Sequence, residues 1–150
     1  MPSSVLDSAK TAAELHVALG RLVRRVRAGG ALPLGKLAVL GLLERDGPQT
    51  TTELAAARLV RHQSMARTVG LLIAGGLIGQ RAHPTDARKR QLEILSPGRA
   101  LLEEERERRA DWLATAIDAS LSSSEHRSLA EAVELLGRLA DLEPPPTVAI

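Results

Sequence analysis

Apolar residues recur along most of the chain at the spacing of a helix, and at the spacing of a strand in two short stretches. Leu15, Leu19, Leu22 and Val26 follow one another at steps of three or four residues, which places them on one face of a helix. Stripes of this kind predict six helices, which begin near residues 8, 33, 50, 62, 96 and 122. In the third helix, Leu59 is among the residues expected to face the core.

The strand-like stretches are residues 77–81 and 91–95, and the second alternates polar and apolar positions. The connection between them, residues 82–90, is polar and turn-prone. The two stretches therefore predict a β-hairpin with a loop of roughly nine residues.

Two helix starts carry the spacing of a capping box. Thr50 precedes Glu53 by three residues, and Ser122 precedes Glu125 by the same interval. In a capping box each of the two side chains binds the backbone N–H of the other residue, so both positions predict a well-defined first turn.

Composition removes several classes of function. The chain has no Cys, which excludes disulfides, thiolate metal sites, a catalytic Cys and thiol redox sensing. It has one Trp and neither Phe nor Tyr, which disfavours a single-strand binder that stacks bases on aromatic rings. No apolar run approaches the roughly 18 residues of a membrane span. The first residues lack a basic region followed by an apolar core, so a secretory signal is not expected. The expected compartment is the cytoplasm.

Charge is distributed unevenly along the chain. Residues 58–99 carry eight Lys or Arg against two Asp or Glu, whereas residues 100–150 carry five against eleven. A basic middle beside an acidic C-terminal third indicates a face for a polyanion such as nucleic acid. A solvated basic surface is the alternative.

The order helix, helix, helix, strand, loop, strand is that of a winged helix-turn-helix domain. Within it, Glu53-Leu54-Ala55, Gly76-Leu77-Ile78 and Leu95-Ser96-Pro97 stand in the order and spacing of Glu-Leu-Ala, Gly-Leu-Val and Leu-Thr-Pro in the MarR family. The chain therefore resembles the MarR family of bacterial transcription regulators, closely over about residues 32–99 and in outline in the flanking helices. Two positions of the turn depart from the family pattern: Leu59 replaces a frequent Gly, and Arg61 replaces a small N-cap residue.

The resemblance implies a mainly α fold with a small β-hairpin wing. It implies a winged helix-turn-helix DNA-binding domain over residues 33–95, and a helical dimerisation module made of residues 1–32 and 96–150. A two-fold dimer presents two recognition helices about one DNA turn apart, so the expected partner is duplex DNA with a near-palindromic operator. A helical cap on a monomer is the alternative for the outer helices.

The fourth predicted helix is the recognition helix in this family. A major groove admits one α-helix, and side chains near its N-terminus reach the base edges. The residues expected to contact DNA there are Arg61, His62, Gln63, Ser64, Arg67 and Thr68. An Arg side chain can pair with guanine and a Gln side chain with adenine. The alternative is that these residues only face solvent.

In the predicted wing, Asp86-Ala87-Arg88 looks like the family's Asp-x-Arg motif, if the loop is one residue longer than usual. The resemblance implies that Arg88 enters the minor groove and that Asp86 holds the loop. Lys89 and Arg90 follow directly and add positive charge. The alternative is a flexible basic loop that touches phosphates only.

The resemblance further implies a repressor released by a small organic, phenolic or lipophilic ligand. No cofactor and no metal are expected, because the histidines lack ligand spacing and are more naturally surface or capping residues. One rival is a winged-helix protein that binds a protein partner instead of DNA. A small helical enzyme is the other, and the sequence offers no titratable pair to support it.

Overall fold

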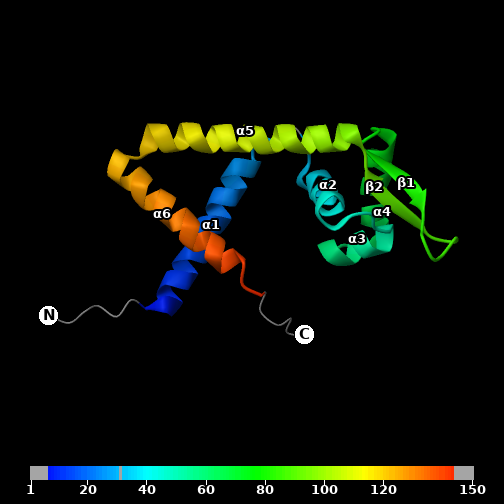
Figure 1. The fold of residues 1–150 in the computed structure, drawn as a ribbon, viewed down its shortest axis with the longest axis horizontal. Helices are drawn as coiled ribbons and strands as arrows, with labels where there is room; N and C mark the ends of the chain where they lie inside the picture. Colours follow the sequence, from blue (N-terminus) through cyan, green and yellow to red (C-terminus); the bar gives the residue numbers. More distant parts are fainter. Residues whose placement is uncertain (1–6, 31, 144–150) are drawn as a thin grey trace. The chain divides into compact units, whose positions relative to one another are not determined.

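The computed structural model describes residues 7–30 and 32–143, which form six helices and a two-stranded antiparallel hairpin (Figure 1). The elements are α1 (Ser8–Arg27), α2 (Leu34–Asp46), α3 (Thr51–Arg58), α4 (His62–Ala74), β1 (Ile78–Ala82), β2 (Arg90–Ile94), α5 (Ser96–Ser120) and α6 (Ser123–Ala140). This architecture confirms the predicted fold class. Both strands lie within one residue of their predicted bounds.

The chain divides into two compact units, residues 1–110 and residues 111–150. The first unit holds α1 through β2 and the beginning of α5, and the second holds the rest of α5 and α6. The functional division into residues 33–95 for DNA, and residues 1–32 with 96–150 for dimerisation, remains a prediction.

An aliphatic core joins α2, α3, α4, the hairpin and the start of α5. Its buried members are Leu37, Val39, Leu40, Leu43, Leu54, Ala55, Met65, Val69, Leu72, Ile78, Leu92, Ile94 and Leu102. No aromatic ring takes part, because Phe and Tyr are absent and Trp112 is 42% exposed. Burial of this apolar surface is the main force that holds α4 and the hairpin on one body.

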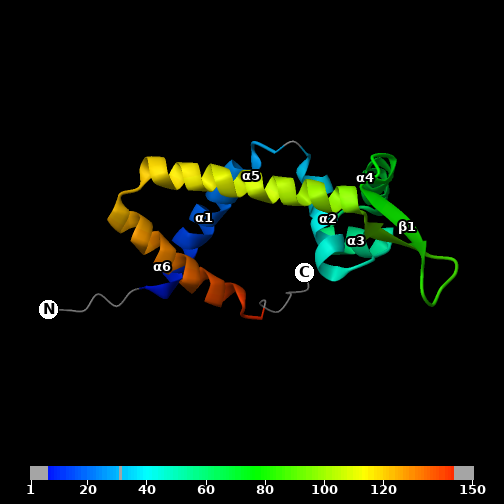
Figure 2. The same ribbon diagram turned by 45° about the horizontal axis from the view of Figure 1, so that its top comes forward.

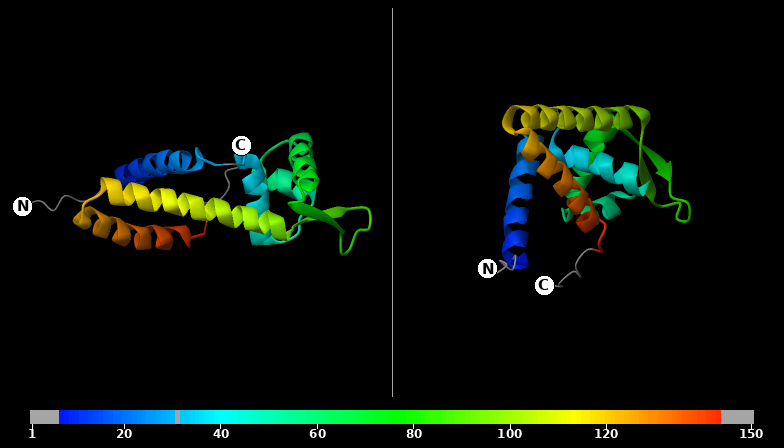
Figure 3. Two further views of the ribbon diagram at one scale, coloured as in Figure 1. Left: turned by 90° about the horizontal axis from the view of Figure 1, so that it is seen from above. Right: turned by 60° about the vertical axis from the view of Figure 1, so that its left-hand side comes forward.

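The hairpin pairs Ile78 with Ile94 and Gln80 with Leu92. A third backbone segment, just before α3, also pairs with the hairpin. Gln49 and Leu92 exchange backbone hydrogen bonds of 3.1 and 2.7 Å. The base of the hairpin is thereby tied to the helical domain. Its loop projects beyond the helices (Figure 2 and Figure 3).

Both predicted capping boxes are present. Glu53 N–H donates to Thr50 Oγ1 at 3.2 Å while Thr50 N–H donates to Glu53 Oε2 at 2.7 Å. Ser122 and Glu125 make the same exchange at 3.3 and 2.8 Å. Hydrogen bonds with Ser122 lower the pKa of the Glu125 carboxyl, and the bond from the Ser122 backbone has the larger effect.

The start of α5 packs against the hairpin at a glycine. A Cβ at Gly98 would collide with the carbonyl oxygen of Leu77 and lie 3.0 Å from Cγ1 of Ile94. That same Leu77 oxygen accepts the N–H of Leu95 at 3.0 Å. Only a residue without a side chain allows α5 to approach this closely.

A buried carboxylate on α5 pairs with an arginine that connects α5 to the segment after α1. Glu105 is 2% exposed and forms ion pairs with Arg108 and, at 4.0 Å, with Arg109. Arg108 also donates to the carbonyl oxygen of Gly29 at 2.6 Å. Buried charges are tolerated only when they are paired in this way.

α1 and α6 are amphipathic helices that bury none of their residues. Their exposed apolar side chains include Leu22 and Val23 on α1, and Leu135 and Leu139 on α6. Amphipathic helices with exposed apolar side chains are typical of surfaces that pack against a partner. None of the helices within residues 7–30 and 32–143 is both long and apolar enough to cross a membrane.

Candidate nucleic-acid interface

A three-residue turn, residues 59–61, joins α3 to α4. Leu59 has φ 52° and ψ 40°, the left-handed conformation that glycine adopts most easily. Its N–H donates to Ala56 O at 3.2 Å, and the next N–H, of Val60, donates to Ala55 O at 3.1 Å. The prediction that Leu59 faces the core is wrong, because this backbone conformation turns its side chain outward and leaves it 94% exposed.

The first turn of α4 carries no side-chain cap. Arg61 occupies the N-cap position, and its side chain makes no capping hydrogen bond, although its carbonyl accepts the N–H of Met65 at 3.1 Å. The amides of a helix's first turn carry the positive end of the helix dipole. They are therefore suited to an anionic partner such as a DNA phosphate.

The outward face of α4 is polar. Met65, Val69 and Leu72 are buried, and a helix advances 100° per residue, so Gln63 and Arg67 lie on the opposite side. Both are exposed, as are Arg61, His62 and Ser64. The arrangement leaves these side chains free to contact a groove.

Thr68 is the least suited of the predicted contacts. It is half-buried, and its hydroxyl donates to the carbonyl oxygen of Ser64 at 3.2 Å. This bond occupies the hydroxyl proton within the helix.

Small residues fill the space beside Gln63 and Arg67 on α4. Ala66, Gly70 and Ala74 are all exposed. A Cβ at Gly70 would meet no atom within 4 Å, so packing within the protein does not require glycine there. A glycine inside a helix destabilises it by roughly 0.5–1 kcal/mol relative to Ala.

The wing loop folds around Asp86. Its Oδ1 accepts the N–H of Arg88 at 3.0 Å, and its backbone carbonyl accepts the N–H of Lys89 at 3.0 Å. Arg88, Lys89 and Arg90 are exposed and form no ion pair within the described part of the chain. Between the predicted residues of α4 and those of the wing, residues 7–30 and 32–143 contain no hydrogen bond or ion pair, so the two groups are separate surfaces of one unit.

His83 is a wing residue whose role the sequence did not reveal. Its Nδ1 lies 3.3 Å from the backbone N of Thr85 and 3.2 Å from that of Asp86. The spacing of the histidines in the sequence does not indicate this role of His83, because the contacts depend on the loop conformation. Among the described residues, no three His, Asp or Glu side chains are grouped so that they could hold a metal ion.

A second feature of the same unit is a groove of about 300 Å³ bounded by the end of α1, by α2, by the end of α3 and by α5. Four arginines line it: Arg27, Arg58, Arg106 and Arg109. Leu37 and Leu102 add apolar surface.

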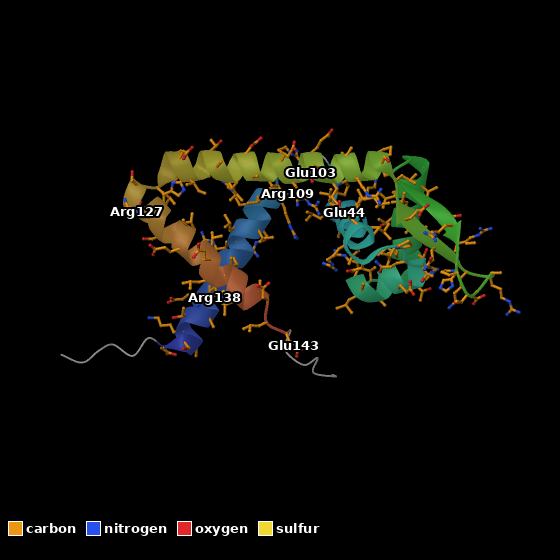
Figure 4. All side chains as sticks on the ribbon, in the orientation of Figure 1. Glu44, Glu103, Arg109, Arg127, Arg138 and Glu143 are labelled. Atoms are coloured by element: carbon orange, nitrogen blue, oxygen red, sulfur yellow. The ribbon has the colours of Figure 1, made fainter. Side chains whose placement is uncertain are left out.

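The four arginines of this groove differ in how far neighbouring carboxylates neutralise their charge. Arg106 donates to Glu44 at 2.7 Å and lies 3.6 Å from Glu103. Figure 4 labels Glu44 on α2, and Glu103 and Arg109 on α5. The hydrogen bond to Glu44 raises the pKa of Arg106. Nε of Arg109 is buried without a hydrogen-bond partner, and Arg27 and Arg58 form no ion pair within the described residues. The groove therefore combines positive charge with apolar walls.

Comparison with known proteins adds independent findings. The sequence profile of the MarR family matches residues 32–89. Among solved structures, a proposed transcriptional regulator of Pseudomonas aeruginosa PA01 is 35% identical, with 91% of this chain and 96% of that chain aligned and a TM-score of 0.77. No match was found among curated proteins.

Two further structures are similar in fold. Transcriptional regulator Tm0710 of Thermotoga maritima is 20% identical over 85% of this chain and 94% of its own, with a TM-score of 0.73. The apo form of wild-type MarR from E. coli is 16% identical over 89% of this chain and 98% of its own, with a TM-score of 0.61.

Proposed function

Because the chain belongs to the MarR family of transcriptional regulators, we propose that it binds duplex DNA as a homodimer, with α4 in the major groove and the wing at the adjacent minor groove. The observation that carries this proposal is the polar outer face of α4. Gln63 and Arg67 lie opposite the buried face of that helix, where a groove can meet them. Arg pairs bidentately with guanine and Gln with adenine.

The wing supports the same function. Arg88, Lys89 and Arg90 are exposed cations on a loop that extends past the helices (Figure 1). A narrow minor groove concentrates negative potential and attracts Arg. Arg88 enters that groove in this proposal, while its neighbours bind phosphates.

Dimerisation is supported by α1 and α6. Each helix carries exposed apolar side chains, among them Leu22 on α1 and Leu139 on α6. A second copy of the chain would bury them, at about 25 cal/mol for each Å² removed from water. A two-fold dimer then requires a near-palindromic operator.

We further propose that the protein is a repressor released by a small organic ligand. The arginine-lined groove supports this, since Arg27, Arg58 and Arg109 offer charge to an organic anion and Leu37 and Leu102 offer apolar contact. A ligand shifts an equilibrium only by its difference in affinity for the two states, so it must favour the conformation that does not bind DNA.

The test is a binding titration against genomic DNA fragments that include the protein's own upstream region, at two salt concentrations. Saturable binding at two chains per near-palindromic site, weakening as salt rises, is expected. Arg67→Ala should cost about 1–3 kcal/mol and relax the preference at one base per half-site. Arg45→Ala, on α2, is the matched control and should leave affinity unchanged, because Arg45 is exposed and, among the described residues, pairs only with its neighbour Asp46.

Reversing the wing charge separates DNA binding from binding to a protein partner. Replacing Arg88, Lys89 and Arg90 by Glu should abolish specific binding and flatten its salt dependence, by about 0.9 in the logarithmic slope for each DNA phosphate that the wing no longer neutralises. Wild-type protein that binds no fragment at either salt, or a reversed wing that binds as wild type, would overturn the proposal in favour of a protein partner.

A further inference from the structure

The wing loop is closed by an imidazole. His83 is the first residue after β1 and is half-buried. Its Nδ1 lies 3.3 Å from the N of Thr85, 3.3 Å from Oγ1 of Thr85 and 3.2 Å from the N of Asp86. Across the base of the loop, the N–H of His83 donates to the carbonyl of Lys89 at 3.3 Å. The imidazole ring therefore holds together, by hydrogen bonds, the turn that leads into Asp86.

Only one protonation state of His83 is compatible with these contacts. A backbone N–H is always a donor, so Nδ1 must offer its lone pair to the amides of Thr85 and Asp86. The proton of the neutral ring then resides on Nε2, an assignment that follows from the hydrogen-bond partners. A second proton would turn Nδ1 into a donor that faces two other donors, and the two hydrogen bonds to the ring would be lost.

Two successive hydrogen bonds link the His83 ring to Arg88, the residue predicted to enter the minor groove. His83 fixes the amide of Asp86, and the carboxylate of Asp86 accepts the N–H of Arg88 at 3.0 Å. The backbone from which the Arg88 side chain starts is thus set by the imidazole. We propose that neutral His83 is a positioning residue for DNA binding, and that its protonation weakens the placement of Arg88. This inference rests on the proposed function.

The surroundings of His83 define what else titrates near it. Within the loop, the charged residues are Asp86, Arg88 and Lys89, and at the strand ends they are Arg81 and Arg90. Arg81 is paired with Glu93 on β2 at 3.5 Å. On α3, Glu53 lines a pocket of about 360 Å³ together with Lys89 and Arg90, so this carboxylate is a further charged group beside the wing.

Two variants test the proposal. His83→Asn places an amide oxygen near the position of Nδ1 and does not titrate, whereas His83→Ala removes the acceptor. DNA affinity is measured for each on the same operator at about pH 8 and pH 5.5 and at fixed ionic strength, since His changes charge between pH 5 and 8. Thermal unfolding of each variant checks that the domain is folded.

At pH 8, His83→Asn should bind within about twofold of wild type and His83→Ala about tenfold more weakly, because alanine offers no acceptor to the two amides. On acidification, wild type should lose about tenfold more affinity than His83→Asn. His62 is present in all three proteins, so its contribution cancels in the comparison.

Nitrogen NMR of the DNA-free protein supplies a readout independent of the proposed function. A neutral His83 ring with its proton on Nε2, and Thr85 and Asp86 amide signals that shift as His83 titrates, are expected. A ring protonated on Nδ1 at neutral pH, or equal affinities and pH profiles for wild type and His83→Ala, would overturn the inference. Wild-type protein with the expected spectrum but no DNA binding would instead overturn the proposed function.

Discussion

Leu59→Gly should stabilise the protein, although it removes an apolar side chain. Leu59 is the only residue other than glycine with a positive φ within residues 7–30 and 32–143. The left-handed conformation costs an L-amino acid roughly 1–2 kcal/mol, because Cβ approaches the following carbonyl oxygen. Glycine has no Cβ and escapes this cost.

The size of the effect follows from three contributions. Relief of the left-handed conformation contributes about 1–2 kcal/mol. Greater freedom of glycine in the unfolded chain subtracts about 0.4–1 kcal/mol. The loss of burial is small, because full burial of a Leu side chain is worth about 1.5–3 kcal/mol and this one is 94% exposed. The free energy of unfolding should therefore rise by about 0.5–1 kcal/mol.

Thermal and urea unfolding of wild type, Leu59→Gly and Val60→Gly measure this directly. Val60 is the matched control, because it is the adjacent turn residue, its φ is not positive, and it is 42% exposed where Leu59 is 94% exposed. Val60→Gly should lower the free energy of unfolding by about 1–2 kcal/mol, while Leu59→Gly raises the midpoint temperature by about 1–4 °C. If both variants destabilise equally, the reasoning from backbone conformation fails.

Three further predictions concern other elements. Gly98→Ala should destabilise the protein by about 1–3 kcal/mol in urea unfolding, because its Cβ would collide with the Leu77 carbonyl; an unchanged midpoint would show that α5 can shift freely. Gly70→Ala should stabilise α4 by about 0.5–1 kcal/mol yet weaken operator binding, and unchanged affinity would show that DNA does not approach this position. The lowered pKa of Glu125 stabilises the fold above its ordinary value of 4.5, and this stabilisation is lost as pH falls through the lower folded-state pKa. Unfolding followed from about pH 6 to 3.5 should therefore show a steeper loss of stability in wild type than in Glu125→Gln, and parallel curves would contradict this.

Features that depend on neighbouring residues in the sequence were predictable. Both capping boxes form as expected, because a capping box needs only the residue at the N-cap and the one three positions later. The outward placement of Gln63 and Arg67 follows from the apolar periodicity of α4 alone. The hairpin also follows from local alternation and turn residues.

Features that depend on a particular backbone conformation or on tertiary contacts were not predictable. Leu59 continues the apolar spacing of α3, but the helix ends one residue earlier and the left-handed turn reverses the side chain. His83 acts through contacts to amides two and three residues ahead, which exist only once the loop has closed. The groove joins arginines that lie far apart along the chain, at positions 27, 58, 106 and 109.

The positions where the chain departs from the usual preferences for turns, helix caps and helix interiors lie on or beside the surfaces proposed to bind partners. A left-handed leucine precedes α4, an uncapped Arg61 begins it, and an exposed Gly70 interrupts it. Each departure lowers the stability of the isolated chain, and each lies on or beside the helix proposed to enter DNA. Sequences that satisfy local rules elsewhere break them mainly at functional sites. The uncovered apolar stripes of α1 and α6 fit the same account, because a second copy of the chain would restore the burial that the single chain lacks.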